Sequence, residues 1–219
     1  MKKTVMTAMA VLVALVWFGM QSVQSAPVLD QSQTQDDTTA VRVFLGRDVC
    51  QTFTANATGF LSKVSLLLSA TVNQQAPATI SIMGTTGAQN IPDPTNILWT
   101  GTFANLATGW FDVDTTNTYP AIVLGSVYGI RITSADNIVG GDDDKWSAQS
   151  VGNLYTAGSL FENRGSGWVP LTINSSPFPD ADAAFKTYVD AVPEPATVSL
   201  MVLALALTTF VTFRTRRHA

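Results

Sequence analysis

Apolar residues fall into short segments along most of the chain, and turn-forming residues separate these segments. The clearest segment spans residues 60–70, where Phe60 and Val64 lie on one side of an alternating pattern and Lys63 and Ser65 lie on the other. A period of two residues is typical of a strand with one face in the core and one in solvent. The pattern therefore predicts a β-strand here, with Phe60 and Val64 on one face. Leu61 and Leu67 break the alternation, so both faces are expected to be partly covered.

Further segments have the same character. They are residues 51–54, 79–83, 98–103, 110–114, 122–124, 127–133, 158–162, 168–171 and 183–189. Stretches rich in Gly, Pro, Asn and Asp separate them, among them residues 91–96 and 140–144, which are expected to be turns. No interior stretch sustains an apolar repeat at helical spacing for three turns. Many short strands predict an all-β domain over residues 40–190, an antiparallel β-sandwich or jelly roll.

Residues 26–39 do not follow this pattern. They are polar, rich in Gln, Asp, Ser and Thr, and almost free of large apolar side chains. A segment with so little apolar surface to bury gains too little to offset the entropy lost on ordering. We therefore expect a flexible polar lead-in before the sandwich.

The chain begins with two lysines, a long apolar run and a short stretch of small and polar residues. This order is typical of a secretory signal peptide, here residues 1–25, which would form a helix. Cleavage by signal peptidase is expected between Ser25 and Ala26. The alternative is an N-terminal helix that stays uncleaved as an anchor.

A second apolar run, of 18 residues, spans residues 196–213. As a helix it would be about 27 Å long, enough to cross the hydrocarbon core of a bilayer. A basic tail follows and is expected on the cytoplasmic side; it contains Arg214, Arg216 and Arg217. The segment before the run is an exposed, non-helical joint, made of Pro193, Glu194 and Pro195.

This end of the chain, residues 192–219, closely resembles the PEP-CTERM sorting signal of exported bacterial proteins. The resemblance rests on the Pro-Glu-Pro motif, the apolar span and the basic tail, in that order. It implies a transient inner-membrane precursor in a Gram-negative bacterium. It also implies recognition by an exosortase, a membrane cysteine protease-transpeptidase of bacteria that usually make exopolysaccharide. The alternative is an ordinary membrane anchor that contains Pro-Glu-Pro by chance.

The interior of the chain, from about residue 41 to residue 189, is similar to the choice-of-anchor β domains of exported proteins. The matching pieces are residues 51–54, 59–64, 109–113, 124–132 and 182–189. The resemblance implies a jelly-roll sandwich like many carbohydrate-binding modules, and it implies no catalytic residues.

The region between the terminal segments is strongly acidic. All 16 acidic residues lie within residues 26–195, against seven basic ones, so the net charge there is −9 rather than the −4 of the whole chain. An acidic surface repels phosphate backbones, which argues against nucleic acid as a partner. Exopolysaccharide, cations or another protein fit this charge better.

The residue types that most hydrolases need are missing. The single histidine, His218, lies in the basic tail that processing would remove, so no imidazole is left for a catalytic triad or a zinc site. The single cysteine, Cys50, is either a small buried residue or a site of inter-chain pairing. We therefore expect a protein that is not an enzyme. The alternative is a glycoside hydrolase or lyase that acts on exopolysaccharide through carboxylates such as Glu162.

Two aromatic residues are candidates for glycan binding. Trp146 and Trp168 lie beside loop residues, where an indole ring could stack on a sugar; packing under a loop is the alternative. Trp99 and Trp110 fall within strand patterns and are expected in the core.

One acidic run is a candidate for Ca²⁺ binding. Asp142, Asp143 and Asp144 follow two glycines and offer oxygen ligands, although the spacing is not that of an EF-hand. The alternative is a solvated acidic turn. Asp112 and Asp114 share one side of a predicted strand and have the same two options. No other cofactor is expected.

Overall fold

The structure is a computed structural model that describes residues 26–69, 76–104, 106–135, 144–150, 155–173, 176–177 and 181–191. The predicted signal peptide and the predicted sorting signal lie outside these residues. So do the site residues Ser25, Asp142, Asp143, Pro193, Glu194, Pro195, Arg214, Arg216 and Arg217. Among the described residues, no helix has the length and apolar character needed to span a bilayer.

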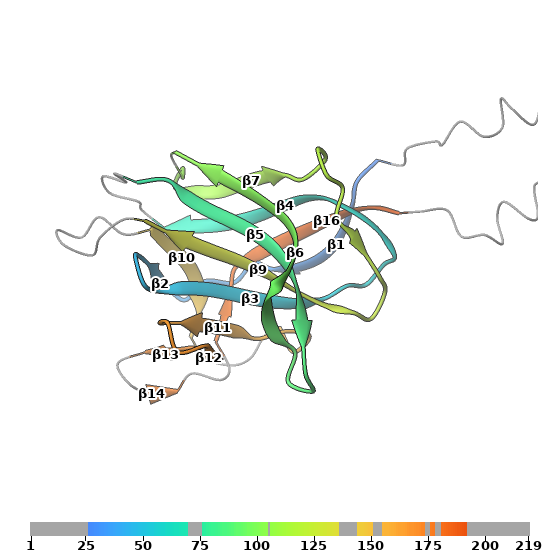
Figure 1. Ribbon diagram of the computed structural model, residues 1–219. Helices are drawn as coiled ribbons and strands as arrows, with labels where there is room; N and C mark the ends of the chain where they lie inside the picture. The colour runs from blue at the N-terminus through green and yellow to red at the C-terminus, as the bar shows by residue number, and fades with distance from the viewer. Residues whose placement is uncertain are drawn as a thin grey trace, which may run out of the picture.

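Two antiparallel sheets face each other and form a β-sandwich (Figure 1), which confirms the all-β prediction. The eight-stranded sheet contains β1 (Val28–Gln33), β2 (Thr39–Val43), β4 (Gly59–Ser69), β7 (Gly109–Asp114), β8 (Ala121–Ile122), β10 (Asp144–Gln149), β15 (Asp182–Ala183) and β16 (Phe185–Ala191). The six-stranded sheet has the order β12 (Trp168–Pro170), β11 (Leu160–Asn163), β3 (Asp48–Thr54), β9 (Val127–Ser134), β5 (Ala78–Thr86) and β6 (Ile91–Phe103). A small separate pair consists of β13 (Thr172–Ile173) and β14 (Ser176–Pro177).

Strand β4 is the centre of the larger sheet. Leu66 pairs with Phe185 of β16 on one edge of β4 and with Phe111 of β7 on the other. Near its end β4 also pairs with β10, through Leu68 and Trp146. Because β4 has partners on both edges over most of its length, it is an interior strand of this sheet.

A β-bulge changes which side of β4 faces the core. Tyr188 pairs with Lys63, but the next residue of β16, Val189, pairs with Leu61, so β4 contains one extra residue at this point. The alternation is thereby reversed beyond the bulge. Leu61 is fully buried and Phe60 is 42% exposed. The prediction that Phe60 shares one face with Val64 is therefore wrong.

The predicted lead-in is not a simple flexible segment. Residues 28–33 form β1, an edge strand that pairs with β16 from Val28–Val189 to Gln33–Phe185. The hydrogen bonds of a strand pair come from the backbone, so a polar segment can form one without an apolar face of its own. The expected turn over residues 91–96 is also wrong, because β6 begins at Ile91 and pairs with β5 there through bulges.

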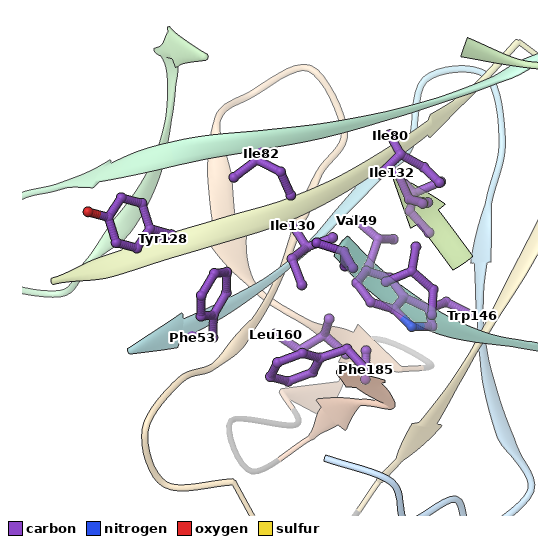
Figure 2. Packing of buried hydrophobic residues seen from close by; sticks show 14 of the residues in the cluster. Val49, Phe53, Ile80, Ile82, Tyr128, Ile130, Ile132, Trp146, Leu160 and Phe185 are labelled. Atoms are coloured by element: carbon purple, nitrogen blue, oxygen red, sulfur yellow. The ribbon is translucent and has the colours of Figure 1, made fainter. Parts of the chain in front are cut away.

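The core fills the space between the two sheets, and Figure 2 shows side chains from both meeting there. The six-stranded sheet contributes Val49, Phe53, Ile80, Ile82, Ile130 and Ile132, and the larger sheet contributes Trp146 and Phe185. The rings of Phe53 and Phe185 are 6.1 Å apart between centroids, a contact across the two layers. Trp146 is fully buried, and its indole nitrogen donates a hydrogen bond of 2.8 Å to the carbonyl oxygen of Ala184.

A buried polar bridge also joins the two layers. The side-chain nitrogen of Gln51 on β3 donates to a carboxylate oxygen of Asp182 at 3.2 Å, and its side-chain oxygen accepts from the backbone N–H of Ala183 at 2.7 Å. The backbone N–H of Tyr155 donates to the other oxygen of Asp182 at 3.1 Å. These bonds satisfy polar groups that burial would otherwise make costly.

We expect Trp146→Phe to lower the free energy of unfolding by roughly 2–3 kcal/mol, because it leaves a cavity and removes the donor to the Ala184 carbonyl. The matched control is Trp110→Phe, whose ring lies 39% exposed on the outside of the same sheet. For the control we expect a change below about 1 kcal/mol. Urea unfolding followed by circular dichroism measures both, and equal losses would contradict the assignment of Trp146 to the core.

Candidate functional site

The structure separates the two tryptophans that the sequence suggested for glycan stacking. Trp146 is fully buried between the sheets, so it offers no ring face to a sugar and the stacking hypothesis is wrong for this residue. The reason is that Trp146 belongs to strand β10 and lies on the same side of it as Ala148, which is also buried. Trp168 is half-buried on the outer side of the six-stranded sheet, where it packs against Cys50, Met83 and Phe161. For Trp168 the hypothesis stays a prediction.

Asp144 is the only described residue of the proposed Ca²⁺ run. It is buried at the start of β10, on the same side of that strand as Trp146 and Ala148. Within the described part of the chain, no three histidine, cysteine, aspartate or glutamate side chains are grouped as metal ligands would be. The Ca²⁺ hypothesis now depends on Asp142 and Asp143, outside the described residues, and stays a prediction.

Glu162 and Cys50 are both enclosed by the fold. The carboxylate of Glu162 accepts bonds from Nε of Arg47 at 2.9 Å and from Nε of Arg164 at 3.0 Å, and its side chain is 2% exposed. Cys50 is fully buried, which confirms that interpretation and places the thiol out of reach of another chain. Burial also raises the pKa of the Cys50 thiol, so it stays protonated and unreactive.

The outer face of the eight-stranded sheet exposes aromatic and charged side chains together. Trp110 on β7 is 39% exposed, so its expected place in the core is wrong, whereas Trp99 is buried as expected. Val113 points inward from β7, and Trp110, Asp112 and Asp114 therefore point outward by alternation.

The strand register brings these residues beside two lysines and a tyrosine. Asp112 pairs with Ser65 of β4, which pairs in turn with Lys186 of β16. In the next row, Asp114 pairs with Lys63, which pairs with Tyr188. We call Lys63, Ser65, Trp110, Asp112, Lys186 and Tyr188 the outer-face cluster.

Short contacts connect the members of the outer-face cluster. Nζ of Lys186 lies 3.9 Å from the ring centroid of Trp110, and Nζ of Lys63 lies 4.2 Å from that of Tyr188. Both are within the range of a cation–π contact. Nζ of Lys63 also donates to Asp112 at 3.1 Å, and the hydroxyl of Ser65 donates to the other oxygen of Asp112 at 2.5 Å. The cluster therefore presents ring faces, ammonium groups and a carboxylate on one open surface.

The sequence contains one signal for this exposed surface, which is the side of the strand that Trp110 shares with two aspartates. Asp112 and Asp114 share one side of the predicted strand, and the same alternation puts Trp110 on that side. A tryptophan in register with two aspartates is on the solvent face of a strand whose other face is apolar. What the sequence could not give is the pairing of β7 with β4 and of β4 with β16.

No protein-family model and no curated protein matches this chain. The fold is similar to a solved structure of a variant of the clostridial cysteine protease Cwp84 after propeptide cleavage, with a TM-score of 0.53 and 12% identity over 76% of this chain and 40% of that chain. A structure of the cysteine protease and lectin-like domains of Cwp84, a surface layer associated protein of Clostridium difficile, also matches, with a TM-score of 0.46 and 12% identity over 66% of this chain and 32% of that one. At this identity the first likeness shows the fold alone, and this chain spans less than half of the proteins it matches.

We expect the pKa of Asp112 to lie below its ordinary value of 3.8, because the Ser65 hydroxyl and the Lys63 ammonium stabilise the charged form. The resulting stabilisation is present above about pH 4 and is lost as the pH falls through the lowered pKa. Ser65→Ala should raise the pKa of Asp112 toward 3.8. NMR titration of the side-chain carboxyl carbon measures this value.

The control is Ser69→Ala, on the same strand and paired with Lys145 rather than with β7. It should leave the titration of Asp112 unchanged. An equal shift in both variants would mean that the Ser65 hydroxyl does not hold the carboxylate.

Proposed function

We propose that this chain is a non-enzymatic exported protein of the cell surface or extracellular matrix of a Gram-negative bacterium, sorted by an exosortase and associated with exopolysaccharide. The observation that carries the proposal is the pair of terminal segments. A segment with the residue order of a signal peptide precedes the acidic sandwich, and a Pro-Glu-Pro motif, an apolar span and a basic tail follow it. Such a chain enters the inner membrane at both ends and is released when both ends are processed.

The arrangement of β1 and β16 supports this proposal. Val28 pairs with Val189, so the start of the first strand and the end of the last strand lie side by side (Figure 1). The expected signal-peptidase site precedes Val28 by two residues, and Pro193 follows the end of β16 by two. Both apolar segments of a precursor can therefore lie in one membrane without disturbing the sandwich.

The side chains that an enzyme would need also favour a non-enzymatic role. Glu162 is held by two guanidinium groups away from solvent, and Cys50 is buried with a raised pKa. The proposal also includes a jelly-roll topology, two terminal helices and a transient stay in the inner membrane.

We expect Glu194→Ala to leave the precursor in the inner membrane with its C-terminal segment intact, because the exosortase would no longer recognise the motif. The mature protein should then fall to background in the surface and medium fractions. Mass spectrometry of the chain from its native host, fractionated into inner membrane, surface and medium, reports both termini.

The matched control is Val192→Ala, which changes the neighbouring residue and keeps the Pro-Glu-Pro motif. It should be processed like the parent chain. If the parent chain itself is recovered only as the intact 219-residue polypeptide in the inner membrane, the proposed sorting is wrong.

A further inference from the structure

The basic residues of this acidic domain are divided between the sides of its two sheets. All three lysines of residues 26–195 lie on the outer face of the eight-stranded sheet, on β4, β10 and β16, and Arg42 on β2 pairs in register with one of them. The other three basic residues belong to the six-stranded side, where Arg47, Arg131 and Arg164 form ion pairs with Glu162 or Asp48. One face of a domain with a net charge of −9 therefore holds four of its seven positive charges.

The two aromatic rings of the outer-face cluster are not bare. An ammonium group lies over Trp110 and another over Tyr188. A neutral sugar that stacked on these rings would have to displace both cations, and it would offer no charge in return. A sugar that carries a carboxylate could keep the ammonium groups as charge-assisted donors, which form stronger hydrogen bonds than neutral ones.

The remaining polar groups suit a sugar as well. Asp112 is ionised at neutral pH, and from the described residues it accepts two bonds, from Lys63 and Ser65. An ionised carboxylate has about four acceptor positions, so sugar hydroxyls can donate to those that are left. The cluster therefore offers donors for an acid group and an acceptor for hydroxyls on the same surface.

We propose that the outer-face cluster binds an acidic polysaccharide of the uronate type. The ammonium groups of Lys63 and Lys186 would move from the rings to the carboxylates of the ligand, and its hydroxyls would donate to Asp112. The apolar sides of its sugar rings would then lie against Trp110 and Tyr188. The inference rests on the proposed association with exopolysaccharide and names the chemical class and the site.

The spacing of the rings favours a polymer over a single sugar. Trp110 is level with Leu67 of β4, and Tyr188 is level with Lys63. Four residues of a strand separate these positions, roughly 13 Å along the sheet. This is longer than one pyranose ring, so one ligand that touches both aromatic residues must contain several sugars.

The test measures binding of the full chain, purified in a polyoxyethylene detergent that has no sugar headgroup, at physiological ionic strength. The probes are polygalacturonate, alginate, hyaluronate and the exopolysaccharide of the host, each compared with its carboxyl-reduced form. We expect binding to at least one acidic probe and a loss of about tenfold or more when its carboxyls are reduced.

Lys186→Gln and Trp110→Ala should each weaken this binding by about tenfold or more. The matched controls are Arg164→Gln and Trp168→Ala, one positive charge and one tryptophan on the other side of the sandwich, which should bind like the parent chain. Thermal unfolding of every variant separates a lost contact from a lost fold.

Three results would overturn the inference: no binding to any acidic probe, equal binding to the carboxyl-reduced forms, or a loss confined to Trp168→Ala. Processing in the native host distinguishes a failure of this inference from a failure of the proposed function. Lys186→Gln should be cleaved and exported normally and yet be washed from the matrix into the medium. If export and processing succeed while glycan binding is absent, the inference fails and the proposed sorting stands.

Discussion

One buried side chain, Gln51, fixes the last part of the domain against the first. Its amide group bonds to the carboxylate of Asp182 and to the backbone of Ala183, across the space between the two sheets. These two residues lead directly into β16, so the bridge sets where that strand enters the larger sheet. The outward positions of Lys186 and Tyr188 and the point at which the chain leaves the sandwich both follow from it. A buried amide that loses either partner would leave unsatisfied polar groups in the core.

The position of β16 has a consequence for folding. It lies between β1 and β4, so the last strand of the domain completes the centre of the larger sheet rather than its edge. Its pairs join residues that are more than a hundred positions apart, such as Val64 with Thr187. Contacts of this kind form late, because a long loop must be closed before they are gained. The larger sheet therefore cannot be completed until the end of the domain is available for pairing.

Local patterns predicted most of the strands, and long-range pairing decided the rest. The alternation over residues 127–133 and 110–114 identified β9 and β7, because each has one apolar face. It failed at Phe60, since a bulge that depends on β16 cannot be seen in β4 alone. It also missed β1, which is held by backbone pairing and has few apolar side chains.

The tryptophans show the same limit for the site. The sequence predicts loop residues beside Trp146, namely Asp144 and Lys145, although Ala148 repeats its inward side two residues later. The sequence predicts Trp110 in the core because it falls within a strand pattern, although it shares its side of that strand with Asp112 and Asp114. The sequence alone does not specify which strands pair with β10 and β7, so it does not show which other side chains lie beside each tryptophan.

An exposed tryptophan on an edge strand needs protection from unwanted association. Strand β7 pairs only with β4 among the described strands, so one of its edges is open to another chain. Charged side chains on an edge strand oppose such pairing, and Asp112 and Asp114 lie on this strand. The ammonium group of Lys186 lies over the ring of Trp110 and covers part of its apolar surface. The groups that keep this face soluble are thus the ones that would contact an acidic glycan, and no rearrangement of the sheet is needed to change from one role to the other.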